Sequence, residues 1–130
     1  MPITLQSLHK SIKERVQTLG LLDANEHLVI SAGDVFSNTA IVSTAPGPTE
    51  VRTGIPFSGG AGHLLWDCLR PYGFTRNNTY VTNVVKRPLS TARTEEATAI
   101  NKHELALWAE VLKNELSLLP NLQYIFILGD

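Results

Sequence analysis

The chain has 130 residues, a formal net charge of −1 at pH 7 and a hydrophobic fraction of 43%. This length and composition predict one domain over residues 1–130, with a hydrophobic core of its own. The near-neutral charge excludes a global positive field, so any nucleic-acid binding has to be local. The sequence has no apolar run of about 20 residues and no signal-peptide pattern, which predicts a cytoplasmic protein without a membrane partner.

Cysteine and histidine usage limits the metal chemistry. The single cysteine, Cys68, excludes a disulfide framework and a metal site built from cysteines. Cys68 falls in an apolar helical stretch at 64–69, so we expect a small core residue and not a reactive thiol. His103 follows Lys102 without a second ligand four residues away, and we therefore predict no metal and no cofactor.

The first half of the chain predicts a helix, two strands and a second helix. Hydrophobic residues recur at steps of three and four from Leu5 to Leu19, which indicates an amphipathic helix with Thr4 as its N-cap. An apolar run at 28–31 predicts an edge strand, followed by a turn at 32–34. The uninterrupted apolar character of 39–43 is typical of a strand buried on both faces. A Gly/Pro-rich loop and a helix over 61–72 follow.

The second half repeats this alternation of strands and helices. Residues 80–85 predict a second central strand, 94–120 a long helix and 124–128 a third apolar strand. This order favours an α/β fold, a three-layer α/β/α sandwich around a mainly parallel sheet. Right-handed crossovers then place 43–47 and 83–86 at the same carboxyl edge of neighbouring strands.

Two segments carry the functional signal. The first reads Ser-Thr-Ala-Pro-Gly at 43–47, passes Glu50 and continues as Thr-Gly-Ile-Pro-Phe-Ser-Gly-Gly-Ala-Gly at 53–62. The second reads Thr-Asn-Val-Val-Lys at 82–86. In this order and spacing they resemble motifs of the uracil-DNA glycosylase superfamily, above all its iron–sulfur-containing bacterial and archaeal branch. The resemblance runs from about residue 28 to residue 130.

The resemblance implies an enzyme of base excision repair. Such an enzyme flips uracil, or a related damaged base, out of DNA and hydrolyses its bond to the sugar. On this interpretation Phe57 stacks on the base, although it can equally be a core aromatic. Asn83 reads the base edge, because one amide offers both a donor and an acceptor. The alternative for Asn83 is a turn residue at a strand end.

The loop after the first strand has a matching role. Backbone amides of the segment Ala45, Pro46 and Gly47 can hold a uracil oxygen as the leaving base becomes negative, with Pro46 stiffening the loop. Thr44 stands where the family has its acid. A hydroxyl is no general base at neutral pH, so Thr44 is expected to orient the attacking water, with Asn83 as the second catalytic residue. Glu50 is the nearest carboxylate, and we expect it to stabilise the loop.

Basic residues follow the second segment. Lys86, Arg87 and Arg93 form a local cluster beside the predicted pocket mouth, with Arg52 as a candidate fourth member. Such a cluster can hold the DNA backbone on either side of a flipped nucleotide. The alternative is an ordinary solvated loop.

The sequence departs from the family in two further ways. It cannot supply four cysteine ligands for a cluster, and Arg87 stands where one ligand is expected. The family's closing His-Pro-Ser motif is absent, so we expect a sheet that is incomplete at its C-terminal side. The strand at Tyr124–Leu128 would then be an apolar edge, which we expect to be covered by further chain, a partner chain or self-association.

Three functions remain open at this point. The first is a glycosylase acting on uracil-containing DNA. The second is a non-catalytic module that keeps the base pocket and binds uracil-containing or abasic DNA. The third is a structural subunit of the same fold, in which the loop is only scaffolding.

Overall fold

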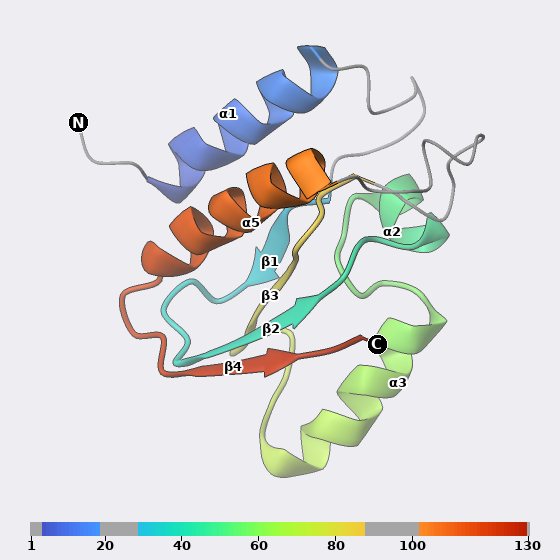
Figure 1. Ribbon diagram of the computed structural model, residues 1–130. Coiled ribbons are helices and arrows are strands. Elements are labelled where there is room, and N and C mark those ends of the chain that lie inside the picture. The colour runs from blue at the N-terminus through green and yellow to red at the C-terminus, as the bar shows by residue number, and fades with distance from the viewer. Residues whose placement is uncertain (1–3, 19–28, 88–101, 130) are drawn as a thin grey trace.

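The protein is an α/β structure whose helices lie on both faces of a sheet (Figure 1). One face carries α1 (Leu5–Thr18) and α5 (Lys102–Ser117), and α3 (Gly60–Leu69) lies on the other. The predicted three-layer α/β/α fold is confirmed. The computed structural model describes residues 4–18, 29–87 and 102–129.

The sheet of the described residues has the strand order β1-β3-β2-β4. Its central strand β2 (Thr39–Ser43) runs parallel to β3 (Tyr80–Asn83) on one side and to β4 (Tyr124–Ile127) on the other. The remaining strand, β1 (Ser31–Gly33), pairs antiparallel with β3. The mainly parallel character predicted from the sequence is thus confirmed.

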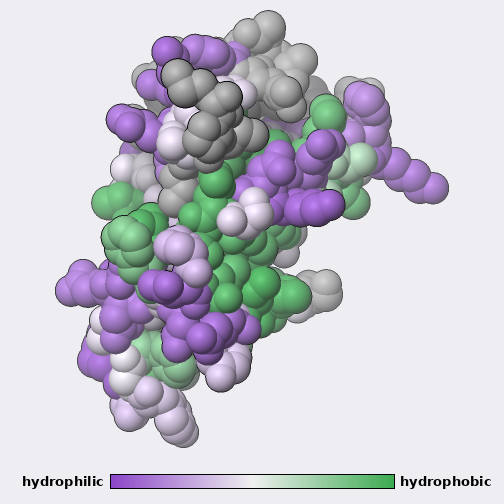
Figure 2. All heavy atoms as spheres, turned by 90° about the vertical axis from the view of Figure 1, so that its left-hand side faces the viewer, coloured by the Kyte–Doolittle hydropathy of each residue, from purple (hydrophilic) through white to green (hydrophobic). Residues whose placement is uncertain are grey.

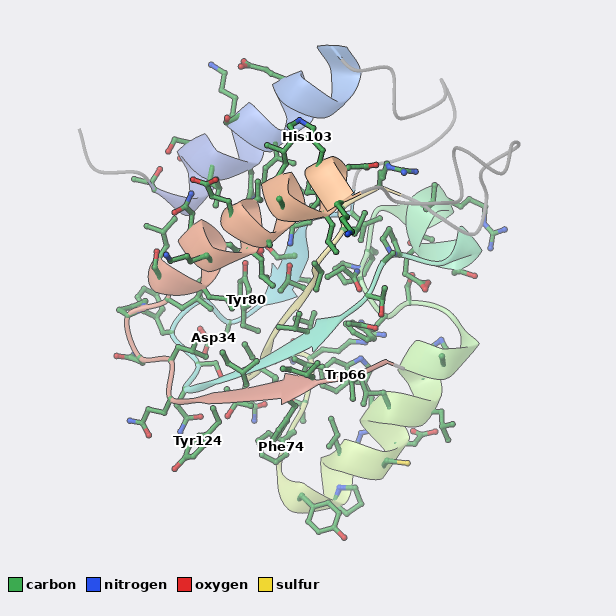
Figure 3. The ribbon with its side chains drawn as sticks, viewed as in Figure 1. Asp34, Trp66, Phe74, Tyr80, His103 and Tyr124 are labelled. Carbon is green, nitrogen blue, oxygen red and sulfur yellow. The ribbon has the colours of Figure 1, made fainter. Side chains whose placement is uncertain are left out.

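Side-chain alternation along the strands divides the core between the two faces. Ala40 and Tyr80 pack with Leu119, two residues after the end of α5. Their neighbours Ile41 and Val81 pack on the opposite face with Trp66 of α3. Figure 3 shows Tyr80 between the sheet and α5 and Trp66 between the sheet and α3.

Helix α1 contributes to a further cluster of buried hydrophobic residues. Its buried residues Leu8 and Ile12 pack with Val85, which follows β3, and with Trp108 of α5. The Thr4 hydroxyl accepts a hydrogen bond from the Ser7 backbone N–H at 3.1 Å, so the predicted N-cap is confirmed.

The structure corrects the expected turn at 32–34. Residues Ala32 and Gly33 continue β1, and the turn begins only at Asp34. Gly33 has φ +96°, and a Cβ there would lie 1.9 Å from the carbonyl oxygen of Thr79. The glycine is therefore required by the close approach of β1 to the chain before β3.

A short helix lies within the segment that the sequence predicts to be a loop. Helix α2 (Pro48–Thr53) begins after Gly47 and ends at Gly54, which has φ +78°. Proline in the first turn and a left-handed glycine just after the last turn are favourable helix boundaries. The helix fixes the path of the loop between the two halves of the first motif.

Strand β4 forms one edge of the described sheet, and its four residues are exposed. Ile127 is 81% exposed and Tyr124 58%. Hydrophobic residues run through the middle of the face in Figure 2, between hydrophilic groups above and below. In the part of the chain that the structure describes, no helix is long and apolar enough to span a membrane.

Candidate functional site

Strand pairing brings the two sequence motifs to one edge of the sheet. Ser43, the last residue of β2, lies opposite Asn83, the last residue of β3. Beyond the strands, the Val84 N–H donates to Ser43 O at 2.9 Å and the Val85 N–H to Thr44 O at 3.0 Å. The segments after the two strands are therefore held side by side, as predicted. Ligands of open parallel sheets bind at this carboxyl edge.

Asn83 lies on the α3 face of the sheet, two residues after Val81, which packs on Trp66. The residue is 3% exposed. Its side-chain amide makes no hydrogen bond to the residues that the structure describes, so its donor and acceptor are available to a ligand. Phe57 packs against the same cluster of Ile41, Trp66 and Val81. The two predicted base-binding side chains therefore share one face of the sheet.

The backbone at Phe57 is held in an unusual conformation. Phe57 is a non-glycine residue with φ +56°, in the left-handed region. Such a conformation in a bulky residue persists only where the surroundings impose it, and it is enriched at functional sites. Gly62 of α3 packs directly on this backbone, because a Cβ at Gly62 would lie 1.9 Å from the Phe57 carbonyl oxygen.

Arg76 holds the same loop from the other side. Its guanidinium donates to the carbonyl oxygen of Pro56 at 3.1 Å and to that of Phe57. It also lies over the Trp66 ring, 5.3 Å from the centroid. Burial lowers the pKa of Arg76, and the negative charge of Glu50 opposes that shift. Arg76 therefore fixes the segment that presents the Phe57 ring.

Glu50 lies between the two glycine-containing parts of the first motif. A Cβ at Gly47 would come within 3.1 Å of its Oε1, and one at Gly59 within 3.0 Å of its Oε2. Oε2 is buried and accepts no hydrogen bond from the described residues. The predicted loop-stabilising role fits this position, and the structure also brings close to the loop a carboxylate oxygen that has no donor among the described residues.

The remaining residues of the first motif lie along the path from β2 to α2. Thr44 is exposed, and a Cβ at Gly129 would lie 2.8 Å from its hydroxyl oxygen. Ala45 packs against the core cluster of α1 and α5, and Pro46 is buried. Gly47 caps α2, and its carbonyl accepts the Val51 N–H at 3.0 Å.

The structure does not bring the predicted phosphate-binding cluster together at the surface. Lys86 is fully buried, with its ammonium 2.7 Å from Oε1 of Glu115 in α5. Arg87 is also buried and binds Glu104 of α5 through Nε at 2.5 Å and Nη2 at 3.1 Å. Both cations are engaged with acids of α5, which corrects their assignment to the DNA backbone. Arg93 lies outside the described residues.

Three residues of this region were not found from the sequence. Arg76 and Trp66 support the Phe57 loop, and Glu115 binds Lys86 from 29 positions away. Glu115 lies on the helix face that also carries Trp108, among apolar residues. The sequence signal for Glu115 is an acidic residue on an apolar helix face, because a buried carboxylate is almost always paired with a positively charged group.

The residues do not fit an iron–sulfur cluster. Cys68 is exposed on α3, so the prediction of a core position for it was wrong. Where the resemblance expects one ligand, Arg87 forms an ion pair with Glu104. Among the described residues no group of three or more His, Cys, Asp or Glu side chains is arranged to hold a metal ion.

A mainly parallel sheet with a glycine-containing loop and a buried asparagine at neighbouring strand ends defines an α/β protein whose candidate site lies at the carboxyl edge of the sheet. The sequence profile described as "Uracil DNA glycosylase superfamily" matches residues 30–130. The chain belongs to this superfamily.

Curated relatives agree with the profile. The chain is 33% identical over 118 residues to a type-4 uracil-DNA glycosylase of Thermotoga maritima, covering 87% of this chain and 62% of that protein. It is 38% identical over 82 residues to a type-4 uracil-DNA glycosylase of Pyrobaculum aerophilum, covering 63% of this chain and 41% of the relative. The chain thus spans less than two thirds of either relative. The predicted resemblance to the bacterial and archaeal branch is confirmed.

Proposed function

We propose that the chain is a uracil-DNA glycosylase-like protein that binds uracil-containing DNA in the cytoplasm and excises the base. The observation that carries the proposal is the parallel pairing of Ser43 with Asn83, which brings the loop and the asparagine of the two motifs to one edge. The uracil-DNA glycosylase relatives support the same reaction class.

The site offers the contacts that recognition of a flipped uracil needs. The Asn83 amide can donate to O4 of uracil and accept from N3–H, a pairing that disfavours cytosine. The Phe57 ring, whose backbone is held by Arg76 and Gly62, can supply a stacking surface. The backbone N–H groups of Ala45 and Gly47 can stabilise the charge that develops on the leaving base, while Pro46 between them has no N–H to donate.

The hydrolytic step needs an oriented water. Thr44 is exposed at the end of β2 and can hold a water through its hydroxyl. Glu50 places a carboxylate near Gly47, and its Oε2 accepts from no described residue. Thr44 is thus proposed to orient the water, while Glu50 fixes the loop. The proposed phosphate contacts are Arg93 and Arg52, of which Arg52 is exposed on α2.

A second candidate is a module that binds the base without hydrolysis. Thr44 favours it, because a hydroxyl stands where the resemblance expects an acid. The two candidates share the pocket and differ only in turnover. Binding of uracil-containing or abasic DNA without base release would support the second.

The test is release of uracil from a labelled single-stranded oligonucleotide, followed by alkaline cleavage of abasic sites. Asn83→Ala should lower the release rate about 100-fold, whereas Asn77→Ala, on an exposed turn, should leave it unchanged. Folded protein without release would refute the glycosylase proposal. If Asn83→Ala and Phe57→Ala then leave DNA binding unchanged, while the exposed Phe36→Ala serves as control, the pocket itself is refuted.

A further inference from the structure

The buried ion pair between Lys86 and Glu115 has a direct connection to the candidate site. Both side chains are 0% exposed. Burial of an ammonium is costly unless each of its three donors has an acceptor. Lys86 meets this condition, because its Nζ donates to Oε1 of Glu115 at 2.7 Å, to Oγ1 of Thr82 at 2.8 Å and to the carbonyl oxygen of Asn83.

The acid of the pair is held in turn by Tyr80. The Tyr80 hydroxyl donates to Oε2 of Glu115 at 2.5 Å. Burial and the neighbouring Glu115 charge raise the pKa of Tyr80, which keeps the hydroxyl protonated as a donor. Burial lowers the pKa of Lys86, while Glu115 favours the charged form. The network therefore joins α5 to three of the four residues of β3.

The carbonyl of Asn83 lies where regular sheet bonding stops on the β1 side. The register of β1 with β3 ends at the pair Ser31–Thr82, one residue before Asn83. Lys86 supplies a donor to Asn83 at this point. The side chain of Asn83 is attached to the Cα atom next to this carbonyl group. A hydrogen bond that fixes the carbonyl therefore also limits the directions in which the side-chain amide can point.

We propose that Lys86 and Glu115 are positioning residues that hold Asn83 at the angle required to discriminate uracil from cytosine. The identity of the ligand in this inference rests on the proposed function, whereas the hydrogen bonds that hold Asn83 do not depend on it. Stability alone does not call for such a pair, because hydrophobic residues of similar volume stabilise a core as well or better. The pair differs from a hydrophobic one in placing a directed donor on the residue that reads the base.

The test uses Lys86→Met/Glu115→Gln, which removes both charges and leaves an amide oxygen to accept from Tyr80. The matched control is Arg87→Met/Glu104→Gln, which removes a neighbouring ion pair between the same two segments without touching Asn83 O. The first readout is the ¹⁵N–¹H signal of the Asn83 side-chain amide, assigned by its absence in Asn83→Ala. It should shift or broaden in the test variant and stay unchanged in the control.

The second readout is the ratio of affinities for uracil- and cytosine-containing single-stranded oligonucleotides. The ratio should fall about tenfold from the parent to the test variant. In a protein that already carries Asn83→Ala, adding the test substitutions should not lower the ratio further, since the effects of coupled residues are not additive. An unchanged amide signal in a folded variant, an equal effect in the control, or full additivity with Asn83→Ala would overturn the proposal.

Two provisions keep the test decisive. If the parent protein does not bind uracil-containing DNA, the proposed function fails and the amide signal alone decides on positioning. If the double variant does not fold, Tyr80→Phe takes its place, because it removes one hydroxyl from the network without changing a charge. The same signal change is expected, and its absence overturns the proposal.

Discussion

The guanidinium of Arg76 donates to the backbone carbonyl of Phe57, a residue 19 positions earlier in the chain. The same guanidinium binds Pro56 O and covers the Trp66 ring. A residue in a disfavoured backbone conformation is thus held by contacts from a distant segment. The stacking surface of the proposed pocket depends on this contact as much as on the Phe57 side chain.

Replacement of Arg76 by Met should therefore cost stability and binding together. Two carbonyl oxygens lose a charged donor, and we expect a loss of about 1–3 kcal/mol in the free energy of unfolding, measured by urea denaturation. Binding of uracil-containing DNA should weaken as well. Arg70→Met, which removes only the exposed ion pair with Asp67, should change stability by less than about 0.5 kcal/mol. Equal losses in the two variants would contradict this role of Arg76.

Two glycines of α3 offer a matched pair of substitutions. A Cβ at Gly62 would meet the Phe57 carbonyl at 1.9 Å, whereas a Cβ at Gly60 would meet nothing within 4 Å. Gly62→Ala should lower the midpoint of thermal unfolding by at least about 5 °C, because the Phe57 backbone has to move. Gly60→Ala should leave the midpoint unchanged or raise it slightly, since alanine is the better helix former. If both variants melt alike, the close approach of α3 to Phe57 is incorrect.

The ion pair of Arg87 and Glu104 should make stability depend on pH in the acid range. Hydrogen bonding by Arg87 lowers the pKa of Glu104 below its ordinary value of 4.5, although burial opposes the shift. A carboxylate with a lowered pKa in the folded state stabilises the protein above its unfolded pKa. That stabilisation is lost as the pH falls through the folded value.

The measurement compares urea unfolding of the parent and of Glu104→Gln. The difference in free energy of unfolding should be largest near pH 6 and should shrink steadily at pH values below 4.5. The exposed Glu110 provides the control, since Glu110→Gln should leave the acid dependence of the parent in place. A difference between parent and Glu104→Gln that does not change with pH would contradict the assignment.

The exposed edge at β4 should be covered in the working protein, by further chain, a partner or another copy. For the purified chain we expect self-association measurable by light scattering. Ile127→Lys should reduce it, because a charge at an edge strand disfavours strand pairing. Leu64→Lys, at a similarly exposed position on α3, should not. A parent protein that is strictly monomeric and stable would count against the prediction.

Several elements could be predicted because their signals are local. The unbroken apolar run of β2 and the turn residues around it fix its bounds at Thr39–Ser43, as expected from the sequence. The stop at Gly73, with φ +89°, was predictable for the same reason, and it ends the 3₁₀ turn Arg70–Tyr72 that continues α3. Once the strands alternate with helices, the handedness of crossovers brings the two motifs to one edge.

The errors concern contacts between distant residues. Lysine is seldom fully buried, so Lys86 was assigned to the surface, and only the fold reveals Glu115 as its partner. The same applies to Arg76, whose acceptors are backbone carbonyls without a sequence signal. Helix α2 was missed for another reason. Pro48 after Gly47 is a local signal for the start of a helix, but the many glycines and prolines of this segment also predict a loop.

The first helix bears on where a domain should be cut. The family profile begins at residue 30, yet Leu8 and Ile12 of α1 pack on Val85 and Trp108, close to Lys86. The residues that match the family profile therefore do not include all the residues that pack into the core, since α1 lies before the start of the match. A fragment trimmed to the family match would leave Val85 and Trp108 facing water, and a protease added to it should cut α5 far sooner than in the intact chain.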